Sequence, residues 1–268
     1  MARLVAGLCS ITLRSLTAEE VIGAAQAAGV GGIEWGADVH VRPGDLATAA
    51  AVARRGRDLG IEVCSYGSYL GVAGPDAPDE VERVLDTAEA LGTTAVRAWT
   101  TLGVTPDVPA VERDRVRDHT AALADAAARR GLAVALEFHP GTLTHTAVDT
   151  VALLEDIGRP NLATHWQPDP TLPPDRALDE LRRVLPHLAE LHVFTWGPAG
   201  IDDRRPLADG AALWPAALAL AASTDRAGPR YALCEYVRDD SPEQLARDVT
   251  TLQRWIDDLD RRPGPGSP

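Results

Sequence analysis

The stretch AAARRGLAVALEFHP, residues 126–140, contains the pattern that decides the fold. A helix-like run rich in alanine ends at Gly131, and the apolar run that follows ends near Glu137 and His139. Glycine suits the left-handed position just after a helix, and a short run of Leu, Val and Phe favours a buried strand. The stretch therefore predicts a helix-to-strand unit with polar side chains at the end of its strand.

The same unit recurs along the chain. Helix-like runs also end at Gly29 before GGIEW, at Gly60 before IEVCSY, at Gly92 before TAVRAW and at Gly158 before NLATHW. The glycines are about 30 residues apart, the size of one strand–helix unit. With strand-like runs at 3–11, 189–194 and 231–237, residues 1–260 predict a single-domain (β/α)8 TIM barrel. A doubly wound sheet fits less well because no GxGxxG opens the first helix. Residues 261–268, RRPGPGSP, predict a disordered tail.

Composition excludes several classes of protein. The 268 residues carry a net charge of -13, which disfavours a nucleic-acid partner because phosphate backbones bind clustered positive charge. All 26 basic residues are arginine, so neither a lysine Schiff base nor a Walker A loop can form. The N-terminal apolar run is too short for a signal peptide or a membrane span. Cys9, Cys64 and Cys234 show no CxxC spacing, so we expect reduced thiols in a cytoplasmic protein.

The aromatic residues predict a pocket at one end of the barrel. Only 4% of residues are aromatic, yet most of them follow directly on a predicted strand. The active sites of TIM barrels lie at the C-terminal ends of the strands, and aromatic walls suit a small ligand with apolar faces, such as a sugar ring. The alternative is that some of these rings only cap the barrel core. The residues concerned are Trp35, Tyr66, Tyr69, Trp99, Phe138, Trp166, Phe194, Trp196 and Tyr236.

Polar side chains occupy the same strand ends. Residues two apart on a strand share a face, so Glu137 points with His139, and His165 with Gln167. Two carboxylates, an imidazole and an amide carbonyl on consecutive strands can converge on one Mn2+, Mg2+, Co2+ or Zn2+ ion. Taken singly, each glutamate also fits a salt bridge with an arginine, and His192 also fits a core histidine. The full set is Glu34, Arg97, Glu137, His139, His165, Gln167, His192 and Glu235.

From the first strand to the last, the motifs GIEWGADVHV, SYGSYL, VRAW, LEFHPGTLT, THWQP, LHVFTW and CEY resemble the sugar phosphate isomerase/epimerase family, the xylose-isomerase-like barrels. In that family, residues that end strands 5 to 8 bind one divalent metal ion. The resemblance implies Glu137, Gln167, His192 and Glu235 as the ligands here. Gln167 departs from the family's acidic residue, which predicts weaker metal binding and a stronger Lewis acid. Asp169 is the alternative ligand.

The resemblance also implies a reaction. Glu137 and Glu235 would act as the acid/base pair that removes and returns a proton beside a carbonyl, while the ion stabilises the enediolate. We therefore expect a metal-dependent isomerase or epimerase that acts on a sugar or related polyol ketone or aldehyde. The residues expected to bind the substrate are Glu34, Trp35, Tyr66, Arg97, Trp99, His139, His165 and Trp196.

Three other functions remain open at this stage. A metal-dependent dehydratase shares the first half-reaction, and a barrel that has lost its metal would be a non-catalytic sugar-binding protein. A DNA-repair endonuclease is disfavoured because it needs more His and Asp ligands and a basic surface. Arg204 and Arg205 would bind a phosphate or carboxylate group of the substrate, or they would be loop residues without a role in binding. The expected partner is a small molecule, without membrane or nucleic acid, and the sequence leaves open whether the protein is a homo-oligomer.

Overall fold

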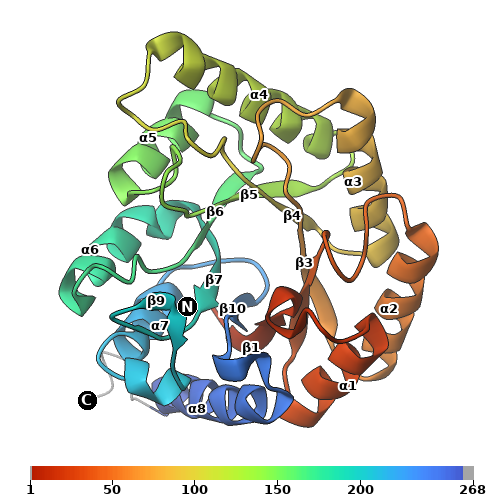
Figure 1. Cartoon of the computed structure of the whole chain (residues 1–268), viewed down its shortest axis with the longest axis vertical. Coiled ribbons are helices and arrows are strands. Elements are labelled where there is room, and N and C mark those ends of the chain that lie inside the picture. The colour runs from red at the N-terminus through yellow and green to blue at the C-terminus, as the bar shows by residue number, and fades with distance from the viewer. Residues whose placement is uncertain (1, 262–268) are drawn as a thin grey trace.

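The computed structural model describes residues 2–261, which form a closed barrel of eight parallel strands (Figure 1). The ring closes because β10 pairs with both β7 and β1. The predicted (β/α)8 barrel is thus confirmed, whereas the tail predicted at 261–268 lies, apart from residue 261, outside the described residues. The barrel strands are β1 Leu4–Cys9, β2 Gly32–Gly36, β3 Glu62–Gly67, β4 Ala95–Ala98, β5 Ala133–Glu137, β6 Leu162–Trp166, β7 Leu188–Val193 and β10 Arg230–Cys234.

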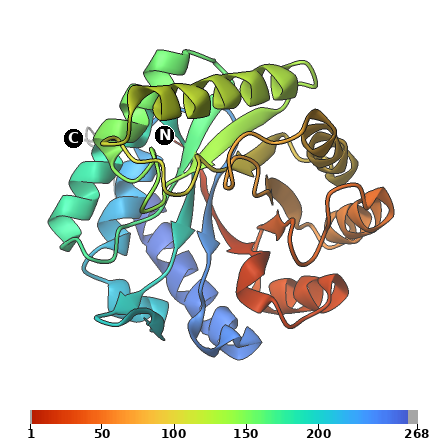
Figure 2. The same ribbon diagram turned by 45° about the horizontal axis from the view of Figure 1, so that its top comes forward.

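The α-helices form a ring outside the strands (Figure 2). They are α1 Ala18–Ala28, α2 Leu46–Asp58, α3 Pro78–Leu91, α4 Ala110–Ala128, α5 Ala147–Ile157, α6 Pro174–Val184, α7 Trp214–Ala222 and α8 Pro242–Asp260. Short 3-10 helices lie at Ser10–Leu13, Leu185–His187, Leu207–Gly210 and Arg238–Asp240. Among the described residues, no helix is both long and apolar enough to cross a bilayer.

Local sequence signals fix the ends of the helices. At α1, the Thr17 side chain accepts from the Glu20 backbone N–H while the Glu20 carboxylate accepts from Thr17, which completes a capping box. The same helix ends at Gly29, whose φ of 78° is the left-handed conformation that glycine adopts at low cost. At α8, Ser241 caps the first turn and Pro242 opens it.

Alternation along the strands divides their side chains between two layers. Glu34 faces the inside of the barrel, so its neighbour Trp35 faces outward, and Trp35 packs in the large apolar cluster between barrel and helices. Tyr66 and Trp166 belong to that same cluster. The outward layer is therefore apolar, and the polar side chains near the strand ends collect inside.

The N-terminal end of the barrel is loosely filled. A cavity of about 820 Å³ opens there, and its lining includes Ala95, Ala133, Ala135 and Ala163, small residues at positions where barrels usually carry branched ones. The cavity lies at the end of the barrel opposite the C-terminal strand ends. It is therefore separate from the cluster of polar side chains described below.

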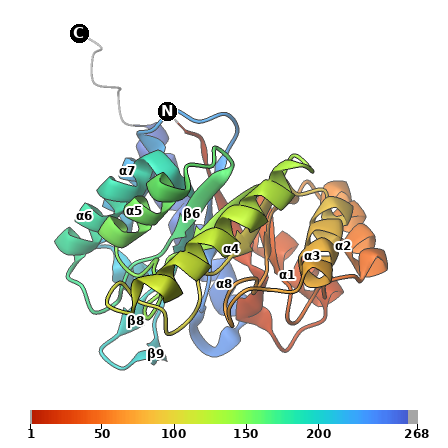
Figure 3. The same cartoon turned by 90° about the horizontal axis from the view of Figure 1, so that it is seen from above.

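A short hairpin follows β7. It consists of β8 Trp196–Gly197 and β9 Gly200–Arg204, which pair antiparallel. In Figure 3 the hairpin projects at one end of the barrel, beyond the ring of helices. The sequence predicts only a loop here, and the hairpin places Trp196 at the C-terminal mouth beside Tyr236.

Candidate active site at the C-terminal strand ends

Seven polar side chains meet inside the barrel near the C-terminal ends of its strands. All are buried, with at most 3% of their surface exposed. Parallel strands bring their C-terminal ends to one side of the barrel, and alternation turns these particular residues inward. They are Cys9 from β1, Glu34 from β2, Arg97 from β4, Glu137 from β5, His165 from β6, His192 from β7 and Glu235 just after β10.

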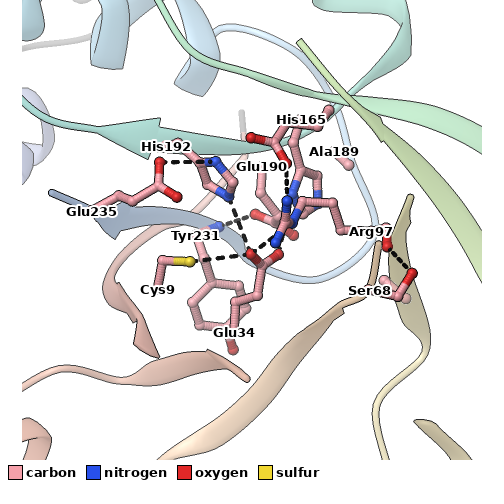
Figure 4. Close-up of polar contacts among 12 residues, drawn as sticks. Cys9, Glu34, Ser68, Arg97, His165, Ala189, Glu190, His192, Tyr231 and Glu235 are labelled. Atoms are coloured by element: carbon pink, nitrogen blue, oxygen red, sulfur yellow. Dashed lines mark hydrogen bonds and ion pairs between the residues drawn. The ribbon is translucent and has the colours of Figure 1, made fainter. Parts of the chain in front are cut away.

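Glu34 is the centre of this cluster (Figure 4). Its Oε1 accepts a hydrogen bond from Arg97 Nε at 3.0 Å and lies 3.3 Å from His192 Nε2 and from Cys9 Sγ. Its Oε2 lies 3.3 Å from His165 Nδ1. Burial alone would raise the pKa of the Glu34 carboxyl, but the charge of Arg97 and the two imidazoles hold that pKa well below its usual value. Glu34 is therefore ionised, and its carboxylate holds Arg97, His165 and His192 together.

Arg97 joins Glu34 to Glu137. Its Nη1 forms an ion pair with Glu137 Oε2, while its Nε binds Glu34. Burial opposes the charged form, yet the neighbouring Glu34 carboxylate raises the pKa of Arg97. The two side chains meet across β3 because Gly67 has no side chain, and a Cβ there would lie 2.7 Å from Arg97 Nη2 and 3.1 Å from Glu34 Oε1.

The pKa values of the two histidines are shifted in opposite directions. Burial lowers the pKa of His165 to about 4, against the pull of Glu34, so its imidazole is neutral at pH 7. Burial also disfavours charge on His192, but the carboxylates of Glu235 and Glu34 raise its pKa above the usual value. Glu235 Oε2 lies 3.3 Å from His192 Nδ1, and burial raises the pKa of Glu235. His192 thus bridges two carboxylates through its opposite ring nitrogens.

Gln167 lies just beyond β6, beside Glu137. Its Nε2 donates to the Phe138 carbonyl oxygen at 2.7 Å and lies 3.4 Å from Glu137 Oε1. These contacts leave the amide oxygen Oε1 buried without a hydrogen-bond partner among the described residues. Asp169, the alternative ligand from the sequence, instead accepts from the Thr171 N–H at 2.8 Å and lies 3.4 Å from His145 Nε2. The predicted ligands therefore form two pairs, Glu137 with Gln167 and His192 with Glu235, which are linked through Arg97 and Glu34.

The cluster is short of cationic and hydrogen-bonding partners. The cluster holds three carboxylates but one guanidinium, which pairs with Glu34 and Glu137, and a proton on His192 would offset only one of the two excess negative charges. Both oxygens of Glu235 and the amide oxygen of Gln167 are among the buried atoms without a hydrogen bond in the described part of the chain. Because unsatisfied buried polar atoms are costly, the cluster is suited to a cation or a polar ligand.

A divalent cation fits these donors. Ligand atoms of Glu34, His165 and His192 lie within 4.8 Å of one another, and so do those of Cys9, His192 and Glu235. Carboxylate, imidazole and amide oxygen donors suit Mn2+, Mg2+, Co2+ or Zn2+. Each set offers three donor atoms, both sets include His192, and neither includes Glu137 or Gln167.

Two groups of aromatic rings stand at the mouth of the barrel. The first aromatic wall consists of Tyr69, Trp99 and His139, with Tyr69 and Trp99 stacked at 6.1 Å and Trp99 and His139 at 4.3 Å between ring centroids. The second aromatic wall consists of Phe194, Trp196 and Tyr236, with centroids 4.5 to 5.7 Å apart. A cavity of about 180 Å³ lies at the second wall, and His139 and Gln167 also line it.

Backbone strain marks the same place. Tyr236, directly after Glu235, has a φ of 48°, a left-handed conformation that is unfavourable for a bulky residue. Such strain of roughly 1–3 kcal/mol persists where the surrounding structure enforces it, commonly at functional sites. Here it turns the Tyr236 ring into the second aromatic wall while Glu235 points inward.

The structure places most, but not all, of the predicted substrate-binding residues at this site. Glu34, Arg97 and His165 lie in the cluster, and Trp99, His139 and Trp196 lie in the aromatic walls. Trp35 and Tyr66 are a correction, because they face outward and Tyr66 donates its hydroxyl to the Val41 carbonyl oxygen. Cys9 was not among the predicted site residues, and Tyr69 was predicted only as one of the aromatic residues around the pocket. Their positions at the ends of β1 and β3 were the available signal.

Comparison with known proteins places the chain among relatives of the same fold. A family model described as xylose isomerase-like TIM barrel matches residues 22–257. No curated protein matches the chain. Among solved structures, the probable 3-DHS dehydratase AsbF from Bacillus anthracis shares 18% identity at a TM-score of 0.77, covering 92% of this chain and 98% of that one.

Two further solved structures are similar. A xylose isomerase-like TIM barrel protein from Mycobacterium smegmatis in complex with magnesium shares 20% identity at a TM-score of 0.66, covering 92% of this chain and 91% of that one. A structure described as L-ribulose 3-epimerase shares 16% identity at a TM-score of 0.71 and is matched over the full length of both chains. At such identities the likeness to these structures concerns the fold.

Proposed function

Because the chain belongs to the xylose isomerase-like TIM barrel family, we propose that it is a divalent-metal-dependent isomerase or epimerase. Its substrate would be a sugar or a related polyol that carries a ketone or aldehyde. The reaction would begin with removal of a proton from the carbon next to that carbonyl. The family and its epimerase structures support this class of reaction.

The observation that carries the proposal is the buried excess of carboxylates. Glu34, Glu137 and Glu235 are all buried, and a single guanidinium, that of Arg97, pairs with two of them, Glu34 and Glu137. A protein tolerates such a charge imbalance only where a cation or a proton compensates it. The xylose isomerase-like neighbour in complex with magnesium supports a divalent ion as that cation.

We assign the metal to Glu137, Gln167, His192 and Glu235. Gln167 presents an unpartnered carbonyl oxygen, and Glu235 presents a carboxylate without a hydrogen bond. Glu137 has its Oε2 held by Arg97, which leaves Oε1 for a ligand. A divalent ion bound there would polarise the substrate carbonyl and stabilise the negative charge that develops after proton removal.

The protein's own residues supply the proton transfers. Glu137 and Glu235 come from strands β5 and β10, on different sides of the barrel axis, so they would approach a bound substrate from different directions. One would take the proton and the other would return it. Burial raises the pKa of Glu235 while no ion is bound, and a divalent ion at this site would favour its ionised form. Arg97 and Glu34 would keep Glu137 and His192 in place during the transfer.

A dehydratase is the second candidate. The probable 3-DHS dehydratase AsbF has the same fold at a TM-score of 0.77. In a dehydratase, removal of a proton beside a carbonyl would be followed by loss of a β-hydroxyl group. The first step would therefore be the same as in an isomerase or epimerase. The two functions differ in their product, because only a dehydratase forms water and a new double bond.

The test combines metal content with proton exchange. Purified protein should contain about one divalent ion per chain by elemental mass spectrometry, and Glu137→Gln and His192→Ala should lose it. Glu190→Gln is the matched control, since Glu190 is a buried carboxylate on β7 that binds the Tyr231 backbone N–H. Exchange of the proton beside a ketose carbonyl in D2O then reports the chemistry by NMR. Wild-type protein that takes up none of the four ions after dialysis would refute the proposal.

A further inference from the structure

Cys9, His192 and Glu235 form a second set of metal donors, the thiol set. Their ligand atoms all lie within 4.8 Å of one another. Cys9 has no role in the proposed function, whose four metal ligands are the oxygen set: Glu137, Gln167, His192 and Glu235. Figure 4 shows Cys9 and Glu235 on the same side of Glu34 as His192. The structure thus brings a thiol close to two ligands of the oxygen set.

The closed ring of strands explains why these three donors meet. Strand β10 lies between β1 and β7. Leu8 is paired with Cys234, and Cys9 and Glu235 directly follow these two residues. His192 comes from β7, on the other side of β10. Three neighbouring strands therefore supply the thiol set, whereas the other two ligands of the oxygen set come from the ends of β5 and β6, beyond β7.

The donors of the thiol set are buried and mostly without hydrogen bonds. Each residue has at most 1% of its surface exposed. Both carboxylate oxygens of Glu235 and both ring nitrogens of His192 lack a hydrogen bond in the part of the chain that the structure describes. Cys9 Sγ donates to Glu34 Oε1 at 3.3 Å, but a thiol is a weak donor. Because unsatisfied buried polar atoms are costly, this arrangement indicates a bound cation.

A thiolate ligand changes which ions the site prefers. Thiolate sulfur favours Zn2+ and other soft ions, whereas carboxylate and amide oxygens suit Mg2+ and Mn2+. The charges of one thiolate and one carboxylate cancel that of a divalent ion, and His192 can bind as a neutral imidazole. Zinc commonly takes three protein ligands and leaves a fourth position open. Coordination would replace the Cys9 S–H bond by a metal–sulfur bond and release the proton to water.

The thiol set and the oxygen set share two ligands. His192 and Glu235 belong to both, so an ion in the thiol set occupies half of the oxygen set. The two sets are therefore in competition, and the outcome depends on the softness of the ion. A soft ion gains the Cys9 sulfur, while a hard ion gains the oxygens of Glu137 and Gln167.

We propose that Cys9, His192 and Glu235 form a binding site for Zn2+ and similar thiophilic ions, which excludes Mg2+ and Mn2+ from the oxygen set. This inference rests on the proposed function only for the oxygen set with which the thiol set competes. Cys9 would thus determine the metal selectivity of the protein without taking part in proton transfer.

Cd2+ is the probe, because a bond between sulfur and Cd2+ adds ultraviolet charge-transfer absorption that nitrogen and oxygen ligands do not add. We expect equimolar Cd2+ to produce this absorption in the wild-type protein. Cys9→Ser and Cys9→Ala should both abolish it. Cys64→Ser is the matched control and should retain it, since Cys64 packs against the same small cluster as Cys9 but is not one of the three donors.

Calorimetric titrations measure the selectivity. Cys9→Ser should bind Zn2+ at least about tenfold more weakly than the wild-type protein. Its Mn2+ affinity should be unchanged, which also shows that the variant is folded. In the wild-type protein, Zn2+ added first should prevent Mn2+ from binding.

The outcomes separate this inference from the proposed function. Cd2+ binding without the absorption, or an absorption that survives both substitutions of Cys9, would overturn the inference. Equal losses of Zn2+ and Mn2+ affinity in Cys9→Ser would also overturn it. Mn2+ binding and ketose proton exchange without the absorption would leave the proposed function standing alone. A Cys9-dependent absorption in a protein that exchanges no ketose proton would do the reverse.

Discussion

Replacing Gln167 with glutamate changes the charge of the proposed metal site without changing the shape of the side chain. In the wild-type protein, Gln167 Nε2 donates to the Phe138 carbonyl oxygen at 2.7 Å and faces Glu137 Oε1 at 3.4 Å. In Gln167→Glu an oxygen takes the place of this donor. In the metal-free variant, the introduced carboxylate would therefore face two acceptors.

The size of this repulsion follows from the distance. Two negative charges 3.4 Å apart repel by about 5 kcal/mol at an effective dielectric constant of about 20, equivalent to more than three units of pKa. The introduced carboxyl should therefore keep its proton at pH 7 while no metal is bound. A divalent ion that takes this oxygen as a ligand displaces the proton. The variant should thus release about one more proton per bound ion than the wild-type protein.

Isothermal titration with Mn2+ measures this proton release. Titrations at pH 7 in two buffers with different enthalpies of ionisation give the number of protons released per ion. At pH 8.5, where the proton is more easily lost, we expect Gln167→Glu to bind Mn2+ at least about tenfold more tightly than the wild-type protein. At pH 6.5 most of this advantage should disappear.

Gln253→Glu is the matched control. Gln253 Nε2 also donates to a carboxylate, Asp257 Oδ1 at 2.8 Å, but on the exposed surface of α8. This variant should bind Mn2+ as the wild-type protein does. If Gln167→Glu released no additional proton and bound Mn2+ with wild-type affinity at both pH values, position 167 would not be a ligand, and the reasoning would fail.

Three further substitutions test the buried network. Glu34→Gln removes the main partner of buried Arg97, so we expect the free energy of unfolding to fall by about 3 kcal/mol in urea titrations, against no change if the pair is dispensable. Gly67→Ala places a Cβ 2.7 Å from Arg97 Nη2 and should cost about 1–3 kcal/mol in the same assay, with a smaller loss contradicting the close approach. Burial raises the pKa of Glu190 to about 7, so the folded protein keeps a proton that the unfolded chain loses, and stability should fall as pH rises from about 4.5 to 7. In the presence of a chelator, Glu190→Gln should flatten this part of the pH profile of melting temperature, and an unchanged profile would disprove the shift.

The architecture could be predicted because its signals are local. Each helix-ending glycine and each apolar run acts within a few residues of itself, and Gly29, Gly92 and Gly158 do adopt positive φ just after helices. The inward register of Glu137 and His165 obeys an equally local rule, since two-residue alternation depends only on the chain itself. The errors at Trp35 and Tyr66 arose because closeness to a strand end was given more weight than that alternation.

The ion-pair network could not be predicted from the sequence. Glu34 and Arg97 are 63 residues apart and lie on strands that are not neighbours, so their contact depends on the closed ring and on the glycine between them. The sequence identified both as polar residues at strand ends, without indicating that each would be the other's partner. Glu34 was accordingly expected to bind the substrate, whereas in the structure it contacts Arg97, His165 and His192 at the centre of the cluster.

Charge balance connects Gln167 with metal binding and with the reaction. An acidic residue at this position would leave the metal-loaded site with one negative charge, which would repel the negative charge that develops when a proton leaves the carbon next to a carbonyl. With glutamine the loaded site would be neutral, so the charge of a bound metal ion would be less fully cancelled and would stabilise that developing charge more strongly. Weaker metal binding and stronger polarisation would then both follow from one amide side chain, and Gln167→Glu should change the two together.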